Sequence, residues 1–504
     1  MSISKMQSVM KKLSYIISLA AALMIAASCS DFLNIRVEGT MPSTATDYSK
    51  AENIFQPVSA AYAQMRNDIW FPYICVTDVT SDDSDKGSEA SDNSYAKEMD
   101  EYTFTPNNYM FNSLWTGYYD IISSANNALI QEANYYAAMS TDENKAYARE
   151  CANEAKVIRA YAYLELMRTF GSVPIVEGNM TADQLANNPQ VSLDKLYQYV
   201  CKDLDEAIDT LPESYSKAWG TRYTKYTAYA VKAKHALYRE DWTTAASACD
   251  AIISSGKFAL QDDYRFLFSV DGEGCSESLM EIESSDLGQT SGAAPYVLYA
   301  YYQGPRSNTP AGMQGWGFNV PNDNLLTFLQ GRGDAKRIAI TFLERGKTTP
   351  VGDYISDKCP NQYYNGKVYT PLEYNTYNTN AYGYDHNIRL IRYAEILLIY
   401  AEALAHGAPV GTCGLSADDA LHQVQNRAGI ANTSATLANI YDERRAELAL
   451  EGNRIFDLIR LGKVAEVVGA QKSNAKTAFH DYFPIPSTQI SLNEGLVPSP
   501  GYTY

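Results

Sequence analysis

The segment from Arg389 to Gly407, "RLIRYAEILLIYAEALAHG", constrains the fold more than any other part of the chain. Its apolar residues recur at steps of three and four, which predicts a helix that is buried on one face or more. Arg392, Glu395 and Glu402 nevertheless lie inside this pattern. Buried charges destabilise a helix strongly unless they are paired. They could belong to a catalytic site, to a membrane span or to a scaffold of ion pairs.

The rest of the C-terminal sequence favours ion pairs. Arginines and carboxylates alternate along it, and the charged residues are Arg427, Glu443, Arg444, Arg445, Glu447, Glu451, Arg454, Asp457 and Arg460. Nearly every acid has an arginine within one or two helical turns or on a neighbouring helix, and a planar guanidinium matches a carboxylate. We therefore expect these residues to brace helices together and not to form an acid/base site. Three charges in one apolar stretch also exclude a membrane span at 389–407.

Helical patterns dominate most of the chain. Apolar periodicity and capping residues predict helices over 114–133, 143–171, 192–213, 389–407, 416–428 and 434–461. Ser192 is a candidate N-cap, and Gly171 and Gly429 have the positions of C-terminal glycines. The stretch 223–260 reads as two antiparallel helices joined by a tight turn, which is the form of a tetratricopeptide-like unit. The pairs that end near 171 and 213 are candidates for further units.

The pattern changes between 261 and 388. This stretch is rich in Gly, Pro, Asn and Tyr, and only 279–285 reads as a short strand. Long irregular stretches in a compact domain are usually functional loops or disorder, and many aromatic residues argue against disorder. The tyrosines are concentrated in one part of it, at Tyr363, Tyr364, Tyr369, Tyr374, Tyr377, Tyr382 and Tyr384.

The N-terminus has the form of a secretory signal. Lys11 and Lys12 precede an apolar run, which ends in small residues before Cys29. Small residues followed by Cys are typical of the bacterial lipobox, so we expect cleavage after residue 28 and lipidation of Cys29. The alternative is an ordinary cleavage site and a soluble secreted protein. Residues 29–48 are polar and rich in turn formers, as in a tether.

Motifs for catalysis are absent from the sequence. It contains no phosphate-binding loop, zinc-protease motif or nucleophile elbow, and its five histidines are dispersed. The eight cysteines are scattered, so neither a disulfide framework nor a zinc site is indicated. The acidic stretch 81–92 does not match a calcium loop and is interpreted as a solvated loop. A net charge of -18 argues against nucleic-acid binding. We expect no catalytic residue, no cofactor and no metal.

Several stretches, taken together, resemble one family. They are "SCSDFL" (28–33), "LWTGYYDIISSANNAL" (114–129), "EAKVIRAYAYLELMRTFGSVPIV" (154–176), "DWTTAASACDAIISSGKFAL" (241–260), "RYAEILLIYAEAL" (392–404), "NRAGI" (426–430), "ERRAELALEGNRIFDLIR" (443–460) and "FPIPSTQISLNEGL" (483–496). In this order they are similar to the SusD/RagB family of outer-membrane nutrient-binding lipoproteins. Asn493-Glu494 departs from the Asn-Pro usual in the family.

The resemblance implies a mainly α fold. Four tetratricopeptide-like helical hairpins would pack against an irregular, loop-rich region with a few short strands. We accordingly divide the chain into a signal peptide (1–28), a lipidated tether (29–48) and one SusD-like domain (49–504). Within that domain we expect a helical scaffold over 49–260 and 389–470, an irregular ligand-binding region over 261–388 and a tail over 471–504.

The resemblance also implies a function. The protein would be lipid-anchored in the outer membrane, face the cell surface, bind oligosaccharides and deliver them to a SusC-like TonB-dependent transporter. Binding residues do not transfer within such a family, because the loops vary. A peptide ligand, a surface glycosidase and an assembly scaffold without a small ligand remain alternatives. Aromatic-rich loops favour a glycan receptor that is not an enzyme.

Candidate ligand residues follow from the chemistry of a sugar, which has an apolar face and a polar rim. Aromatic rings suit the face, and amide or arginine donors suit the rim. The candidate rings are Trp70, Tyr73, Tyr296, Tyr299, Tyr301, Tyr302 and Trp316, and the candidate donors are Arg306, Asn308 and Gln314. Each ring could instead pack in the core. Trp316, between Gly315 and Gly317, is the strongest candidate for an exposed ring.

Overall fold

The fold is built mainly from helices, as expected, with three two-stranded sheets among the described residues. The computed structural model describes residues 46–216, 220–284, 298–306, 315–371, 373 and 386–504. Residues 51–504 form one unit, and the architecture below is that of this unit. Within the described part of the chain, no helix is long and apolar enough to cross a membrane.

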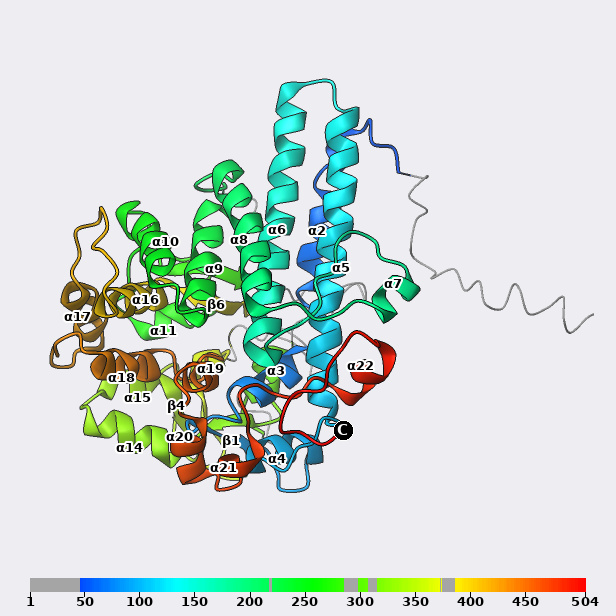
Figure 1. Ribbon diagram of the computed structural model, residues 1–504. Helices are drawn as coiled ribbons and strands as arrows, with labels where there is room; N and C mark the ends of the chain where they lie inside the picture. Colours follow the sequence, from blue (N-terminus) through cyan, green and yellow to red (C-terminus); the bar gives the residue numbers. More distant parts are fainter. Residues whose placement is uncertain (1–45, 217–219, 285–297, 307–314, 372, 374–385) are drawn as a thin grey trace, which may run out of the picture. The chain divides into compact units, whose positions relative to one another are not determined.

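The scaffold is a series of helices in which each one contacts the next. Figure 1 shows their succession from cyan through green to brown. They pair as α5 with α6, α8 with α9, α10 with α16, and α17 with α18. The bounds are α5 Tyr109–Ala138, α6 Asp142–Phe170, α8 Leu193–Thr210, α9 Lys225–Tyr238, α10 Trp242–Ser254, α16 Tyr393–Ala405, α17 Ala417–Ala428 and α18 Leu437–Glu447. The four pairs stack in sequence, so α9 of the second pair also contacts α10 of the third, and these two helices form the hairpin predicted at 223–260.

Capping residues set the ends of these helices. The Ser192 side chain accepts a hydrogen bond from the Lys195 N–H, so the predicted N-cap of α8 is confirmed. Gly429 ends α17 with φ +76, a left-handed conformation that glycine adopts without strain. Helix α5 is longer than its apolar pattern predicted, because Asn108 caps it with a bond from the Met110 N–H.

The region between α10 and α16 is less irregular than predicted. Strand β2 (Ser278–Ile282) occupies the predicted position, whereas α14 (Asp323–Gly331) and α15 (Ala335–Thr341) were not predicted. The other elements are α11 Tyr264–Leu267, η4 Val270–Gly272, α13 Tyr299–Gln303, β3 Phe318–Pro321, β4 Phe342–Glu344, β5 Tyr363–Asn365, η5 Gly366–Val368 and β6 Ile388–Arg392. β2 pairs with β6, β4 with β5, and β3 with β1 (Ser84–Gly87), all antiparallel.

Shorter elements complete the unit before α5, between α6 and α8, and after α18. They are η2 Ala51–Asn53, α2 Gln56–Gln64, α3 Trp70–Thr77, α4 Ser94–Glu101, α7 Ala182–Ala186, α19 Arg454–Arg460, α20 Val464–Gln471, α21 Ala475–Ala478 and α22 Ser487–Leu492. Seven cysteines lie in the described chain, and four of them are buried.

Two predicted helices were wrong in part. The segment expected to be helical from Arg389 begins as strand β6, and α16 starts only at Tyr393. Pairing with β2 overrides the helical periodicity of the four residues before Tyr393. The predicted helix 434–461 is broken between α18 and α19. Leu450 and Gly452 have φ values of +61 and +73, which a right-handed helix does not accommodate.

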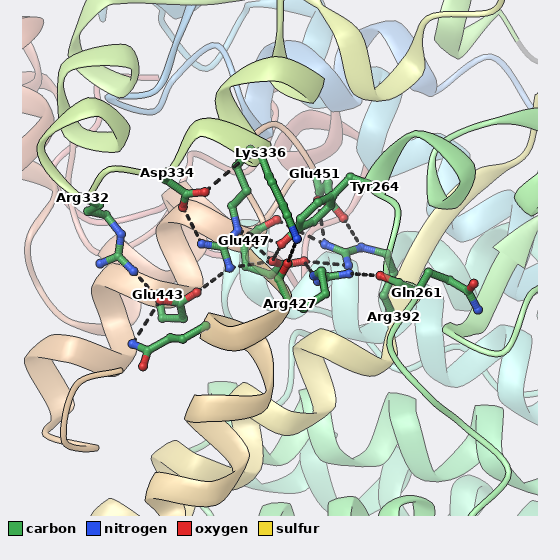
Figure 2. A network of polar contacts seen from close by, with 12 residues as sticks. Gln261, Tyr264, Arg332, Asp334, Lys336, Arg392, Arg427, Glu443, Glu447 and Glu451 are labelled. Atoms are coloured by element: carbon green, nitrogen blue, oxygen red, sulfur yellow. Dashed lines mark hydrogen bonds and ion pairs between the residues drawn. The ribbon is translucent and has the colours of Figure 1, made fainter. Parts of the chain in front are cut away.

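Arg392 stands at the centre of a buried ion-pair network, shown in Figure 2. Its Nη1 lies 2.7 Å from Oε1 of Glu277 and 3.0 Å from Oε1 of Glu447. Its Nε lies 2.7 Å from Oε2 of Glu451. The predicted pairing of Arg392 is therefore confirmed, although the residue ends a strand and does not belong to a helix.

The same network joins elements that are distant in the sequence. Glu447 on α18 also accepts from Arg427 on α17, at 2.6 Å, and lies 2.8 Å from Nη2 of Arg337 on α15. Burial alone would raise the pKa of Glu447, but Arg427, Arg337 and Arg392 hold it well below its ordinary value. A second group connects Arg444 to Asp457, with Nε and Oδ2 3.0 Å apart. These charges fix helices and strands to one another.

The prediction of a solvated loop over the acidic stretch 81–92 was wrong for its first half, whereas residues 89–91 are exposed. Asp82 and Asp83 are buried, and β1 begins directly after them. Nε of Arg454 lies 2.8 Å from Asp82 Oδ1, and Arg445 donates to Asp83 over the same distance. Burial is possible because both aspartates are paired with arginines of the C-terminal segment. They anchor the start of β1 to the scaffold.

Candidate ligand-binding surface

The structure separates the predicted ligand residues into core and surface. Trp70, Tyr73, Tyr299 and Tyr302 are buried; Trp70 is only 2% exposed. The Trp70 ring packs edge-on against Tyr73 at 5.2 Å and Tyr299 at 5.9 Å. The expectation that these rings offer an open face to a sugar is corrected: α3 and α13 turn them into the interior. Tyr296, Asn308 and Gln314 lie outside the described residues.

Trp316 differs from the other rings, because its side chain is 41% exposed. Its ring lies 5.2 Å from that of Tyr302 and 5.8 Å from that of Tyr301, which is partly buried. Phe71, on α3, lies 6.4 Å beneath. Buried aromatic rings therefore support one edge of the indole, while the remainder is accessible from solvent.

Backbone contacts fix the position of Trp316. Its N–H donates to the carbonyl of Tyr301 at 2.9 Å, which joins it to the end of α13. The neighbouring Gly317 accepts from the N–H of Ser88 at 2.5 Å, next to the first residues of the β1–β3 pair. Both flanking glycines are required: a Cβ on Gly315 would meet the Gly304 carbonyl oxygen at 2.5 Å, and Gly317 has φ +72. The Trp316 backbone is thus held between α13 and β1.

A charged pair lies beside this ring. Arg306 forms an ion pair with Asp92, and its Nη1 also lies 3.0 Å from Oγ of Ser88. Ser88 Oγ donates to Oδ2 of Asp92 at 2.6 Å. Arg306 and Asp92 are both partly exposed, so the pair presents a donor and an acceptor to solvent, and the Arg306 side chain starts beside Gly317, the residue after Trp316.

Two further exposed rings continue the surface. Tyr95 on α4 and Tyr109 on α5 meet edge to face at 4.9 Å, and they are 43% and 36% exposed. Nδ2 of Asn93 donates to the Tyr109 hydroxyl at 3.2 Å. Partial burial raises the pKa of Tyr109, and the nearby Asp68 adds to the rise. Asp68 is exposed and accepts from the Tyr302 hydroxyl at 3.0 Å, so it connects these tyrosines with the Trp316 side.

We refer to Trp316, Tyr301, Tyr95, Tyr109, Arg306, Asp92, Asn93 and Asp68 as the Trp316 surface. It combines exposed ring faces with a guanidinium, an amide and two carboxylates. Rings suit the C–H face of a pyranose, and the polar groups suit its hydroxyls. It is an open surface and not a deep pocket: two cavities of about 470 and 510 Å³ lie elsewhere, on α2 and on α5.

Several residues of this surface were missed from the sequence. Asp92, Asn93, Tyr95 and Tyr109 lie far from Trp316 along the chain, and they reach it only through β1–β3 pairing. The run from Asp92 to Tyr95, with three polar side chains before an aromatic one, was a usable signal. It was passed over because the acidic stretch had been interpreted as a solvated loop.

The tyrosine-rich stretch 363–384 is the alternative location for a ligand-binding site. Tyr364 and Tyr369 are buried, and the Tyr364 hydroxyl accepts from the Asn361 N–H at 3.1 Å. Tyr363, on β5, packs edge-on against Phe342 at 5.3 Å. These three rings are therefore part of the packing around β4 and β5. Tyr374, Tyr377, Tyr382 and Tyr384 lie outside the described residues.

Metal and acid/base chemistry find no support in the described residues. No group of three or more His, Cys, Asp or Glu side chains there could hold a metal ion. The strongly charged C-terminal residues, among them Arg392, Glu447 and Arg427, are buried and paired with one another. They are not accessible to a polymeric substrate in this arrangement.

Comparison with known proteins gives a consistent result. The family described as the SusD family matches residues 345–502, and the family described as starch-binding, associating with the outer membrane, matches residues 31–237. SusD-like protein P2 of Formosa agariphila is 26% identical over 98% of this chain and 100% of its own length. The two matched ranges thus lie in opposite halves of the chain.

Solved structures share the fold. A laminarin-binding SusD-like protein has a TM-score of 0.75 at 25% identity, covering 90% of this chain and 99% of its own. Surface glycan-binding protein A from Bacteroides fluxus has the same TM-score and identity, covering 90% of this chain and 100% of its own. SusD-type families match a range in each half of the chain, and SusD-like structures share its fold, so the chain is similar to SusD-type proteins along most of its length.

Proposed function

We propose that this protein is a lipid-anchored, cell-surface glycan receptor that captures oligosaccharides without cleaving them and delivers them to a SusC-like TonB-dependent transporter. The observation that carries the proposal is the exposed indole of Trp316 beside the Arg306–Asp92 pair. A partly exposed ring that is held by the backbone and backed by buried rings offers a sugar a platform that is already in place before binding.

The ligand class follows from the chemistry of the surface. A sugar ring can stack on Trp316 while its hydroxyls exchange hydrogen bonds with Asp92, Arg306 and Asn93. Tyr95 and Tyr109 would extend the contact to further sugar units, so an oligosaccharide fits better than a monosaccharide. The similarity to a laminarin-binding protein and the starch-binding description of one matching family support a glucan as the first ligand to test.

Weak binding is expected. An aromatic contact contributes about 0.5–1.5 kcal/mol beyond area burial, and each net hydrogen bond adds a similar amount. A handful of such contacts, less the cost of ordering the sugar, corresponds to a Kd of roughly micromolar to millimolar. Such a receptor retains its ligand at the cell surface and still releases it to a transporter.

The proposed membrane anchor and the proposed delivery of glycans to a transporter are supported by the sequence and the family comparisons, and not by the Trp316 surface. Cys29 follows a signal-like segment, and one matching family is described as associating with the outer membrane. A lipidated Cys29 and a tether over 29–48 would hold the receptor at that membrane. The SusC-like transporter is the partner that the family resemblance implies.

The proposal is tested by presenting the full-length protein with an array of glycans, including laminarin and starch oligosaccharides, and with a set of peptides. We expect saturable binding to at least one glycan and an unchanged product profile after prolonged incubation. New reducing ends would make the protein a glycosidase. Binding to peptides alone would make it a peptide receptor, and either result would overturn the glycan-receptor proposal.

A further inference from the structure

A groove on the opposite side of α5 from α6 is not explained by glycan binding. It has a volume of about 510 Å³ and is lined by α5, by the segment 174–188 that contains α7, and by α22 with the residues after it. Figure 1 shows α7 and α22 lying beside α5. We call it the α5/α7/α22 groove. None of its lining residues belongs to the Trp316 surface.

The walls of this groove are apolar, and part of that apolar surface is open to solvent. Trp115 and Tyr119 on α5 pack at 5.2 Å and, with Met180, contribute to the lining. Leu185 on α7 is 42% exposed and Leu492 on α22 is 63% exposed, and both line the groove. Large aliphatic side chains gathered at one exposed groove are typical of a protein contact surface.

The rim of the groove carries charge of one sign. The lining segments 115–123, 174–188 and 489–496 contain no Lys, Arg or His. They contain four exposed acids, of which Asp120 lines the groove itself, and Glu177, Asp183 and Glu494 lie next to lining residues in the sequence; none of the four forms an ion pair with another described residue. On the neighbouring α6–α8 pair, by contrast, the exposed acid Glu206 pairs with Lys156. The groove therefore lacks cationic partners for its own carboxylates.

We propose that the α5/α7/α22 groove is a docking site for a polypeptide segment of a partner protein that is both apolar and basic. Aliphatic or aromatic side chains of the segment would contact Leu185, Leu492 and Met180. Lysine or arginine side chains would reach Asp120 and the acids of the rim. Apolar contact supplies the affinity, and complementary charge selects the partner and speeds its association.

Other occupants match the groove less well. The Trp115 ring is buried, so it offers no indole face for a sugar. A second copy of this chain would bring two acidic rims together, and like charges oppose such a contact. A basic, apolar segment satisfies both the exposed aliphatic side chains and the unpaired carboxylates.

The test uses the full-length protein and three short fluorescent peptides. One alternates leucine with lysine, one alternates serine with lysine, and one alternates leucine with glutamate. Binding is measured by fluorescence anisotropy. We expect only the leucine–lysine peptide to bind measurably. Equal binding of the serine–lysine peptide would reveal general attraction to an acidic protein and would overturn the proposal.

Variants locate the binding in the groove. Leu492→Glu adds a negative charge to the groove. If the leucine–lysine peptide were held only by general electrostatic attraction, this variant would bind it more tightly. If the peptide docks in the groove, the variant should bind it more weakly by about tenfold or more. Asp120→Asn should also weaken binding. Glu143→Gln removes the same charge at the other end of the α5–α6 pair and should leave binding unchanged. Leu492 is largely exposed, so its substitution should not unfold the protein, and the Tm checks this.

Three results would contradict the assignment. The first is unchanged or tighter peptide binding by Leu492→Glu. The second is a dimer of the wild-type protein in sedimentation that Leu492→Glu dissociates, because the occupant would then be a second copy. The third is loss of glycan binding in Leu492→Glu, which would make the groove a glycan site. The last outcome is distinct from failure of the proposed function, since glycan binding by the wild type would remain.

Discussion

The indole ring of Trp316 lies 5.2 Å from the ring of Tyr302, yet one is exposed and the other is buried. Within one cluster, the proposed ligand contact Trp316 therefore lies next to a ring of the core, Tyr302. Tyr302→Ala should lower the free energy of unfolding by about 3–5 kcal/mol, as expected for removal of a buried ring. Trp316→Ala should leave the Tm nearly unchanged. Urea unfolding of both variants checks this, and a large loss for Trp316→Ala would show that the ring belongs to the core.

Arg392→Ala tests the scaffold role of the buried charges. The substitution leaves Glu277, Glu447 and Glu451 without a shared cation, so it should lower the free energy of unfolding by about 3–5 kcal/mol. The folded fraction should bind its glycan as the wild type does. Intact stability combined with lost binding would make Arg392 a functional residue.

Lys463→Ala provides the matched control for that variant. Lys463 pairs with Glu466 at 2.7 Å, but both side chains are largely exposed. Surface pairs contribute about 0–1 kcal/mol, so this loss should be small. Losses of similar size in the two variants would argue that the Arg392 network is no more important than a surface pair.

The sequence predicted the scaffold well, because helical periodicity and caps are local signals. Ser192 and Gly429 ended helices where expected. It failed where distant pairing decides the structure. Residues 389–392 have an apolar pattern compatible with a helix, and only β2, more than a hundred positions earlier in the chain, turns them into a strand. Asp82 and Asp83 looked solvated because their partners Arg454 and Arg445 lie near the other end of the chain.

The candidate surface was predictable only in part. Gly residues on both sides of Trp316 indicated an exposed ring, and the structure has one. An aromatic residue such as Trp70 carries no local mark that distinguishes a core ring from a ligand contact, since its neighbours on α3 are equally apolar. The contribution of Tyr95 and Tyr109 depends on how β1 and β3 pair, which no local pattern specifies.

The buried carboxyl group of Glu132 should make the stability of the protein depend on pH. Its carboxylate is buried, and neither oxygen has a hydrogen-bond partner among the described residues. Burial raises the pKa of Glu132 from its ordinary value of 4.5 to about 9, and Glu154 adds to the rise. Because the folded state keeps this proton to a higher pH than the unfolded chain, its contribution to stability falls as the pH rises from 4.5 to about 9.

Glu132→Gln should remove that dependence. At pH 8 the variant should be more stable than the wild type by at least about 1 kcal/mol, and near pH 4 the two should be similar. Urea unfolding across this range provides the measurement. The opposite result would be a wild type that becomes more stable than Glu132→Gln as the pH rises. It would mean that the folded protein stabilises the charged form of the Glu132 carboxyl.

Lipidation of Cys29 is a separate prediction. Mass spectrometry of the mature N-terminus should find an acylated cysteine, with more than one acyl chain, because a single chain anchors only marginally. Cys29→Ala should move the protein from the membrane fraction to the soluble fraction. Retention of the variant in the membrane fraction would point to another anchor.

Glycan binding at Trp316 can be measured by isothermal titration calorimetry of the full-length protein. The titrant is the glycan that binds best in the array. Trp316→Ala should weaken its affinity by about tenfold or more. Phe266→Ala, which removes a comparably exposed ring on α11, should not change it. Equal affinities for the wild type and Trp316→Ala would contradict the assignment of the site to this surface.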